Sequence, residues 1–162
     1  MCGSCGNALH IGGPIWHEKI HNIDFVKRLH ARIEATKDKY GTSGRIKGIL
    51  GGIIDEEPLS HKPLSYDFST VQSQLKMVNM QKKEVIAGFR SLGYLVGQTY
   101  YNHTLWKTNA PPEAIYDIFK QYKKEKYGED YLKNCNEKSL PYIILNREIK
   151  TPEANFDYAQ VQ

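Results

Sequence analysis

The spacing of hydrophobic positions along the chain predicts several amphipathic helices. Within residues 23–35, apolar side chains recur every three or four positions and polar side chains occupy the other faces, as expected of a helix with one buried side. The same spacing predicts helices over residues 45–56, 80–92 and 111–127. The last of these begins with proline and ends at Gly128, and these residues are favoured at the start and just past the end of a helix.

Polar residues that commonly cap helices mark three further boundaries. Ser43 is placed to cap the second predicted helix, and Asn79 is placed to cap the third. Ser69 or Thr70 is placed to cap an additional short helix over residues 71–78.

Two segments in the second half of the chain have the composition of strands. Residues 94–101 and 104–108 are rich in aromatic and β-branched side chains, and we interpret the apolar run at 140–145 as a short buried strand. Residues 59–66 are expected to be extended because Pro58 precedes them and Pro63 lies within them. Two helices followed by two strands favour an α+β fold, winged-helix-like or ferredoxin-like, with several helices and a small antiparallel sheet.

The length of 162 residues suits one ordinary domain. We expect a cysteine-, glycine- and histidine-rich lead over residues 1–22, an α+β domain over 23–150 and a polar tail over 151–162. With 40% hydrophobic and 25% charged residues, the composition is that of a soluble globular protein. No run of 18 apolar residues predicts a membrane helix. The start of the chain lacks the pattern of a signal peptide, so an intracellular, reducing location is expected.

Charge and motifs narrow the classes of function. Lys and Arg number 22 against 18 Asp and Glu, and the net charge of +4 permits an anionic partner without requiring one. Neither GxGxxG nor a GxxxxGK string followed by Ser or Thr occurs, so a doubly wound domain for a nucleotide or S-adenosylmethionine is not expected. The six histidines have no recognisable nucleophile beside them. The acidic run at residues 55–57 is interpreted as the surface end of a helix.

Cys2 and Cys5 form the sharpest local motif. Two thiolates separated by two residues and followed by Gly6 have the spacing of half a tetrahedral zinc site. A structural zinc site needs four ligands, so three interpretations stay open: a half site in a zinc-knuckle-like lead, a complete local site, or no metal. The residues that would complete a local site are His10, His17 and His21.

Basic residues with tyrosines among them are candidates for binding nucleic acid. Many lie on the predicted helices at 80–92 and 111–127, where they would contact phosphates through charge alone. The alternative for these lysines is an ordinary solvated helix face. Trp16, in a rigid turn at residues 12–16, is either a core anchor or an exposed surface on which a base stacks. The candidate RNA contacts are Lys82, Lys83, Arg90, Lys107, Lys120, Lys123, Lys124, Tyr100 and Trp16.

Six short motifs resemble the C-terminal region of the tRNA guanine-26 N2-dimethyltransferases. In chain order they are Cys-Gly-Ser-Cys-Gly (2–6), Gly-Gly-Pro-Ile-Trp (12–16), Ile-His-Asn (20–22), Ala-Gly-Phe-Arg (87–90), Lys-Thr-Asn-Ala-Pro-Pro (107–112) and Glu-Ala-Asn-Phe (153–156). They follow the order of that family over about residues 2–157, so chance similarity does not account for them.

The resemblance implies a part in methylating the N2 amine of a guanine in tRNA. Enzymes of that family bind S-adenosylmethionine in an N-terminal Rossmann-like domain, their C-terminal domain assists tRNA binding, and some hold zinc with two CxxC pairs. This chain contains neither that N-terminal domain nor the first CxxC pair, and Lys19 and Asn22 replace the more usual proline and aspartate. S-adenosylmethionine is therefore expected only in a full-length enzyme, and residues 1–162 alone are not expected to methylate tRNA.

Three hypotheses of function follow. The leading one is a tRNA-binding C-terminal domain of a tRNA (guanine-26-N2)-dimethyltransferase, with tRNA as partner and no membrane contact. The second is an interaction module that docks on a separate S-adenosylmethionine-binding catalytic domain without touching RNA. The third is a zinc-dependent enzyme that uses Cys2, Cys5 and a histidine around an open metal position. The resemblance allows the nucleus, the mitochondrion or the cytoplasm as location.

Overall fold

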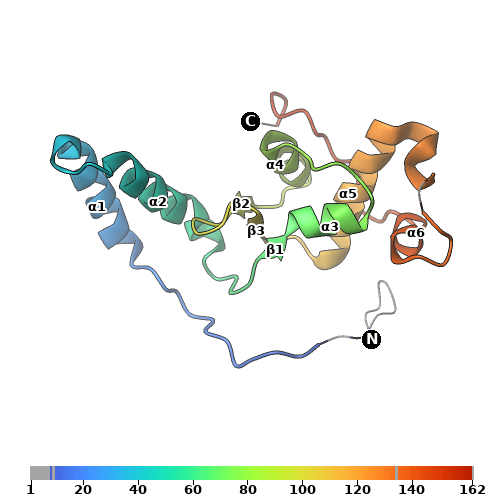
Figure 1. Cartoon of the computed structure of the whole chain (residues 1–162), viewed down its shortest axis with the longest axis horizontal. Helices are drawn as coiled ribbons and strands as arrows, with labels where there is room; N and C mark the ends of the chain where they lie inside the picture. Colours follow the sequence, from blue (N-terminus) through green and yellow to red (C-terminus); the bar gives the residue numbers. More distant parts are fainter. Residues whose placement is uncertain (1–7, 9, 134, 162) are drawn as a thin grey trace. The chain divides into compact units, whose positions relative to one another are not determined.

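The computed structural model describes residues 8, 10–133 and 135–161, so the predicted zinc ligands Cys2 and Cys5 lie outside the described residues. The chain forms two compact units, each built from separate stretches of sequence, and each is described by itself (Figure 1). The sheet unit comprises residues 14–67 and 96–109, and the helical unit comprises residues 1–13, 68–95 and 110–162.

The sheet unit begins with a helical hairpin. Helix α1 (Ile23–Ala35) and helix α2 (Ser43–Glu56) are joined by the short 3-10 helix η1 (Lys37–Lys39), and a second 3-10 turn, η2 (Glu57–Leu59), follows α2. The side chain of Asn22 caps α1 by accepting a hydrogen bond of 3.0 Å from the N–H of Phe25.

The two helices of this hairpin pack through one apolar face each. Their buried contact consists of the side chains of Val26, Ile33, Leu50 and Ile53. These four residues follow the spacing of three and four positions in the sequence, so the predicted amphipathic pattern is confirmed for both helices. The start of α2 differs from the prediction, because Ser43 is its first helical residue and not its cap.

Three short antiparallel strands complete the sheet unit. They are β1 (Tyr66–Asp67), β2 (Val96–Gln98) and β3 (Leu105–Thr108), with β3 in the middle. Tyr66 lies opposite Trp106, and Val96 lies opposite Thr108. The expected small antiparallel sheet is therefore present, although the strand predicted over 94–101 is shorter than its aromatic composition indicated.

The helical unit contains the other four α-helices of the described residues. They are α3 (Phe68–Gln74), α4 (Lys82–Ser91), α5 (Pro112–Tyr127) and α6 (Leu140–Leu145), and the 3-10 turn η3 (Gly128–Leu132) follows α5. Phe68, Phe89 and Phe119 bring α3, α4 and α5 together, with ring centroids 5.1–6.2 Å apart. Each of these rings is at most 1% exposed, so they form the centre of this core.

The prediction of a buried strand at residues 140–145 is wrong, because this segment is helix α6. Ser139 has the extended backbone of a residue preceding a helix, and Pro141 lies in the first turn, where its missing N–H costs nothing. An apolar run of six residues fits a buried helix and a buried strand equally well. Ile144 and Leu145 are buried as the prediction required, but in a helix.

Two helix starts in the helical unit also differ from the predictions. Helix α4 begins two residues later than expected, and its cap is Gln81, whose backbone N–H donates to Glu84 at 2.8 Å, rather than Asn79. Helix α3 begins at Phe68, so the predicted caps Ser69 and Thr70 lie inside it. No helix among the described residues is long and apolar enough to cross a membrane.

Candidate functional site

Helix α4 presents three of the predicted RNA contacts to solvent. Lys82, Lys83 and Arg90 are exposed, whereas Val85 and Phe89 on the same helix are buried in the core of the helical unit. Lys83 and Arg90 are seven residues apart, so they lie on one side of the helix about two turns from each other. The structure thus brings these three cations onto one exposed face, the basic face of α4.

Helix α5 divides its three predicted RNA contacts between surface and core. Lys124 is exposed, and its ammonium lies 5.1 Å from the ring centroid of Tyr131. Lys120 and Lys123 are only 1% and 3% exposed. The two buried lysines have internal partners, which are described next.

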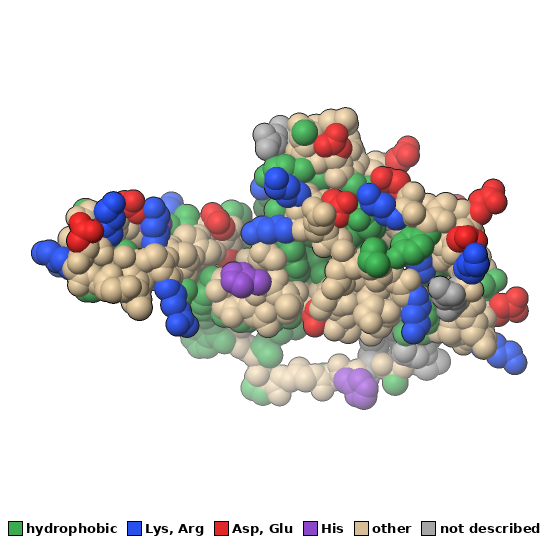
Figure 2. All heavy atoms as spheres, turned by 45° about the horizontal axis from the view of Figure 1, so that its top comes forward, with side chains coloured by type: hydrophobic (Ala, Val, Ile, Leu, Met, Phe, Trp, Pro, Cys, Tyr) green, Lys and Arg blue, Asp and Glu red, His purple; other side chains and the backbone are tan. Residues whose placement is uncertain are grey.

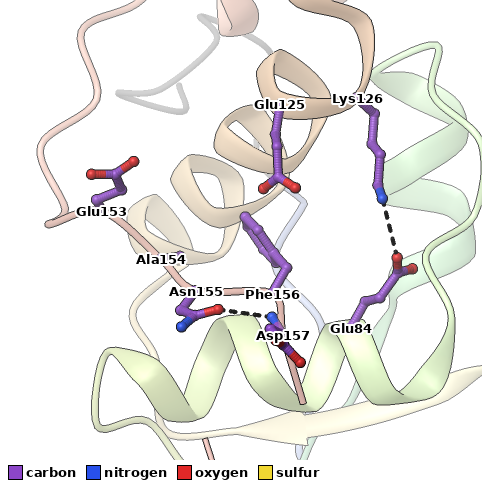
Figure 3. A pocket seen from close by; sticks show the side chains of 8 residues that line it. All are labelled: Glu84, Glu125, Lys126, Glu153, Ala154, Asn155, Phe156 and Asp157. Atoms are coloured by element: carbon purple, nitrogen blue, oxygen red, sulfur yellow. Dashed lines mark hydrogen bonds and ion pairs between the residues drawn. The ribbon is translucent and has the colours of Figure 1, made fainter. Parts of the chain in front are cut away.

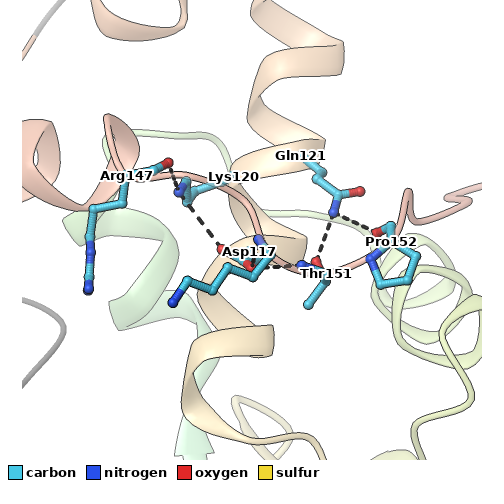
Figure 4. Close-up of polar contacts among 7 residues, drawn as sticks. Asp117, Lys120, Gln121, Arg147, Thr151 and Pro152 are labelled. Atoms are coloured by element: carbon cyan, nitrogen blue, oxygen red, sulfur yellow. Dashed lines mark hydrogen bonds and ion pairs between the residues drawn. The ribbon is translucent and has the colours of Figure 1, made fainter.

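Lys120 holds the segment after α6 against α5. Its ammonium donates to the backbone carbonyl of Arg147 and lies 3.8 Å from the carboxylate of Asp117 (Figure 4). Asp117 also accepts the backbone N–H groups of Lys150, at 2.8 Å, and Thr151, at 3.2 Å. Burial lowers the pKa of Lys120, and the nearby carboxylate opposes that shift. This lysine therefore organises the polar packing of the C-terminal segment.

Lys123 likewise binds a backbone carbonyl, at the end of α3. Its ammonium donates a hydrogen bond of 2.7 Å to the carbonyl of Leu75, just past the last helical residue of α3. Burial lowers the pKa of Lys123. A cation at this position satisfies a carbonyl that the helix itself leaves without an internal partner.

Lys107 is likewise buried, in an ion pair of the sheet unit. Its ammonium lies 2.7 Å from Glu56, and each of the two side chains is 8% exposed. The second carboxylate oxygen of Glu56 accepts the backbone N–H of Tyr100 at 3.0 Å. Glu56 is the last residue of α2 and lies three positions after Ile53, on the buried side of that helix. Its interpretation as part of a surface acidic run is therefore wrong, and the spacing from Ile53 was the signal that indicated burial.

A small cavity adjoins this ion pair. It has a volume of about 40 Å³, and Lys19, His21, Ser60, Glu56 and Lys107 are among the residues that line it. Within the described residues, the buried Nε2 atom of His21 has no hydrogen-bond partner. A cavity of this volume has room for an ordered water molecule.

The cavity joins two of the motifs on which the family resemblance rests. His21 belongs to the motif at residues 20–22, and Lys107 begins the motif at 107–112. In the helical unit, Gly88 and Phe156 join two further motifs, because a Cβ atom at Gly88 would lie 2.6 Å from the ring of Phe156. Segments that are far apart in the sequence are thus held together by close contacts inside each unit.

The two predicted aromatic contacts have different surroundings. Trp16 is 71% exposed, so it is not a core anchor. Tyr100 is half-buried, packs against the core of the α1–α2 hairpin and meets the ring of His21 edge-on at a centroid distance of 5.1 Å. Of these two rings, only that of Trp16 offers an open face of the kind that base stacking requires.

A groove of about 570 Å³ in the helical unit has an acidic lining (Figure 3). Its carboxylates include Glu84, which accepts the hydroxyl of Tyr122 at 2.8 Å and lies 3.6 Å from the ammonium of Lys126. Burial alone would raise the pKa of Glu84, but the hydrogen bonds from Gln81 and Tyr122 and the charge of Lys126 bring it below its usual value. The other acidic side chains of the groove are Glu125, Glu153 and Asp157. A lining with this charge repels a polyanion such as RNA.

The described residues contain no group of three or more His, Cys, Asp or Glu side chains that could hold a metal ion. His10 and His17, two of the residues proposed to complete a local zinc site, are exposed. Cys135 is a free, half-buried thiol. The zinc hypothesis therefore depends on Cys2 and Cys5, of which nothing is described.

Comparison with known proteins gives one consistent result. The sequence model of the family described as N2,N2-dimethylguanosine tRNA methyltransferase matches residues 1–120. A tRNA (guanine(26)-N(2))-dimethyltransferase of Schizosaccharomyces pombe is 30% identical over 97% of this chain and 28% of its own length. The proteins of the same name from Caenorhabditis elegans and Mus musculus are 31% and 32% identical over 96% and 76% of this chain.

The chain spans less than a third of the length of these relatives, from 18% of the mouse protein to 29% of the nematode protein. No solved structure is a significant match.

Proposed function

Because this chain belongs to the N2,N2-dimethylguanosine tRNA methyltransferase family, we propose that it binds tRNA for the methylation of a guanine N2 amine. The observation that carries this proposal is the basic face of α4, where Lys82, Lys83 and Arg90 are exposed together on one side of a regular helix. Cations arranged in this way bind phosphate oxygens without reading the base sequence.

The order of elements supports α4 as the contacting helix. In the sequence, β1, α3, α4, β2 and β3 follow one another, and β3 pairs with both other strands. This is the order of a winged helix-turn-helix, in which the second helix of the pair lies against the nucleic acid. By its place in this order α4 corresponds to that second helix, and its exposed side carries the three cations.

Among the other candidate contacts, the exposed residues Trp16 and Lys124 remain in the proposal. Trp16 offers a ring for an unpaired base, and stacking of this kind is worth about 1–3 kcal/mol. The ammonium groups of the other three lysines are buried against Glu56, Arg147 and Leu75, so in this proposal these lysines only stabilise the fold of each unit. They are Lys107, Lys120 and Lys123.

The chemical step is assigned to the remainder of a full-length protein. S-adenosylmethionine supplies the methyl group when it is bound there. The role of this chain is to position the tRNA so that the target guanine reaches that donor. We also propose that Cys2 and Cys5 supply half of a zinc knuckle, for which two further ligands are needed.

A titration with unmodified tRNA at about 50 and 200 mM salt tests the tRNA-binding proposal. The informative variant is K82Q/K83Q/R90Q, and the matched control is K133Q/K138Q/K150Q. Each variant removes three positive charges from a chain with a net charge of +4, and the control variant removes exposed lysines that are not part of α4. The proposal predicts strong salt dependence for the native chain and a selective loss of affinity in the α4 variant. Equal affinities of the two variants would contradict it.

A second function, docking on a catalytic domain, is favoured by the exposed apolar residues that lead into α1. Ile15, Trp16, Ile20 and Phe25 are each more than half exposed, and the relatives are three to five times as long as this chain. A patch of this kind suits an apolar partner surface. Binding of an S-adenosylmethionine domain that survives high salt, without any tRNA binding, would favour docking.

A further inference from the structure

The positive charge of this chain is concentrated in one short segment. Residues 23–47, which run from α1 through η1 into the first turns of α2, contain seven of the 22 Lys and Arg but only three of the 18 Asp and Glu. The rest of the chain contains fifteen of each and is neutral overall. The whole net charge of +4 therefore resides in residues 23–47, here called the basic hairpin.

We propose that the basic hairpin is a second RNA-contacting surface, separate from the basic face of α4, which binds the phosphate backbone of the tRNA. This inference rests on the proposed function, because it takes tRNA as the partner. It adds a contact surface outside the candidate RNA contacts named above, on the sheet unit rather than on the helical unit.

The cations of the basic hairpin are accessible. All seven are exposed, and Figure 2 shows Lys and Arg side chains spread over this end of the sheet unit. In the described part of the chain, Lys47 forms an ion pair with Glu34, and no carboxylate lies within 4.0 Å of the other six. Those six are Lys27, Arg28, Arg32, Lys37, Lys39 and Arg45. Cations without carboxylate partners give the strongest attraction to an added polyanion.

Helix α1 arranges three of these cations on either side of two small residues. On the side away from the buried residue Ile33, Lys27 lies to one side and Arg28 and Arg32 lie to the other, with small alanines between them at position 31 and at Ala35. The rise of 1.5 Å per residue separates Lys27 from Arg32 by about 7.5 Å along the axis. Small side chains at the centre leave room for a phosphate backbone to approach the helix.

The packing of the hairpin fixes these charges in place. Val26 and Ile33 of α1 are buried against Leu50 and Ile53 of α2, so the cations project from a supported helix and not from a loose segment. A supported helix loses less conformational entropy on binding than a disordered basic tail would lose. The neighbouring ring of Tyr40, which is 44% exposed just after η1, offers an additional surface for stacking on a base.

RNA fits these observations better than an acidic protein does. The exposed cations extend over two helices and the turn between them, and a continuous polyanion such as tRNA occupies such a surface with many equivalent contacts. An acidic protein partner presents fewer, separately placed charges. The test below therefore uses tRNA as the probe.

The variant K27Q/R28Q/R32Q tests the inference beside the α4 variant and the K133Q/K138Q/K150Q control, since all three lose the same charge. We expect the tRNA affinity of the hairpin variant to fall about 10- to 100-fold at 0.1 M salt and the slope of log affinity against log salt to decrease by about 2. The control should change little, and circular dichroism should show unchanged helix content for all variants.

Three other outcomes are distinguishable. An affinity of the hairpin variant equal to that of the control, while the α4 variant loses binding, would overturn this inference and leave the proposed function standing. Equal affinities of all three variants would overturn both. A native chain that does not bind tRNA at about 50 mM salt would also overturn both.

A footprint on the native chain provides a measurement that does not depend on the folding of any variant. Bound tRNA should reduce the acylation of Lys27, Lys37 and Lys39 several-fold, while Lys133 and Lys138 should react as in the free protein. Equal acylation of Lys27 with and without bound tRNA would overturn the inference.

Discussion

Glu56 and Lys107 form an ion pair of 2.7 Å in which both side chains are more than nine-tenths buried. The pair joins the last residue of α2 to the middle of β3, and Glu56 also accepts the backbone N–H of Tyr100. A single carboxylate thus connects the helical hairpin to the sheet at two points.

Replacing Lys107 with methionine should lower the free energy of unfolding by about 3 kcal/mol, because it leaves the charge of Glu56 buried without its partner. The control is K19M, which breaks the Lys19–Glu57 pair, whose side chains are 64% and 35% exposed. An exposed pair of this kind is worth less than about 1 kcal/mol. Urea denaturation of both variants measures the difference, and equal losses would show that the burial of the Glu56–Lys107 pair has no energetic consequence.

Two glycines of α2 should respond in opposite ways to alanine. A Cβ atom at Gly48 meets nothing within 4 Å, so G48A should raise the free energy of unfolding by up to about 1 kcal/mol through helix propensity. A Cβ atom at Gly52 would lie 3.0 Å from the Cβ of Tyr100, so G52A should destabilise the sheet unit by about 1–3 kcal/mol. Thermal melting compares the two, and a stabilising G52A would mean that Tyr100 moves freely.

The carboxylate of Glu84 should contribute to stability in a defined range of pH. Its pKa in the folded protein is below the value of 4.5 that it has in the unfolded chain, so its contribution is complete above pH 4.5 and is lost as the pH falls through the folded value. The variant E84Q should show a smaller loss of stability over this acidic range. The measurement is the free energy of unfolding between about pH 3 and 6, with the exposed residue Glu113 replaced in the control variant E113Q.

Lys123 should affect stability at alkaline pH. Burial lowers its pKa in the folded chain below 10.5, so the folded state releases this proton more easily than the unfolded state. The contribution of Lys123 to stability should therefore increase as the pH rises through the folded value towards 10.5. In K123M this increase should be absent, whereas K124M, at an exposed neighbouring position, should retain it. An identical pH dependence in the two variants would contradict a buried, depressed ammonium at position 123.

The zinc content of the purified chain tests the half-site hypothesis. Cys2 and Cys5 supply two of the four ligands that a structural zinc ion needs, and we expect less than one zinc ion per chain by elemental analysis. One tightly bound zinc per chain, lost in C2S, would instead indicate a complete site. The control is C135S, which removes the free thiol of the described residues.

Periodicity in the sequence was sufficient to predict most of the helices. Helices α1 and α5 each have at least three helical turns with one apolar side, and over that length the spacing distinguishes a helix from a strand. Helix α6 has only six residues and nearly all of them are apolar, so no spacing was available to identify it. The local signals that did exist were Ser139 and Pro141, at the positions that start a helix.

The candidate site was harder to predict, because the sequence does not show what a long side chain reaches. Lys120 and Lys123 were selected for their charge, but the carbonyls of Arg147 and Leu75 that they bind come from other segments of the fold. For Lys123 a signal existed, since it follows Phe119 by four residues and so lies at the edge of the apolar side of α5. The three cations of α4 share their side of the helix with Ile86, which is only half-buried, and they are exposed as expected.

The discontinuity of the sheet unit imposes an order on the synthesis of this protein. Its middle strand, β3, is also the last strand to leave the ribosome, so neither β1 nor β2 can pair before residues 105–108 have been made. The α1–α2 hairpin, in contrast, involves only neighbours in the sequence and can form early and fast. During translation the basic hairpin would therefore be complete while the sheet beside it is still open, and that interval is when the nascent chain most depends on protection from aggregation.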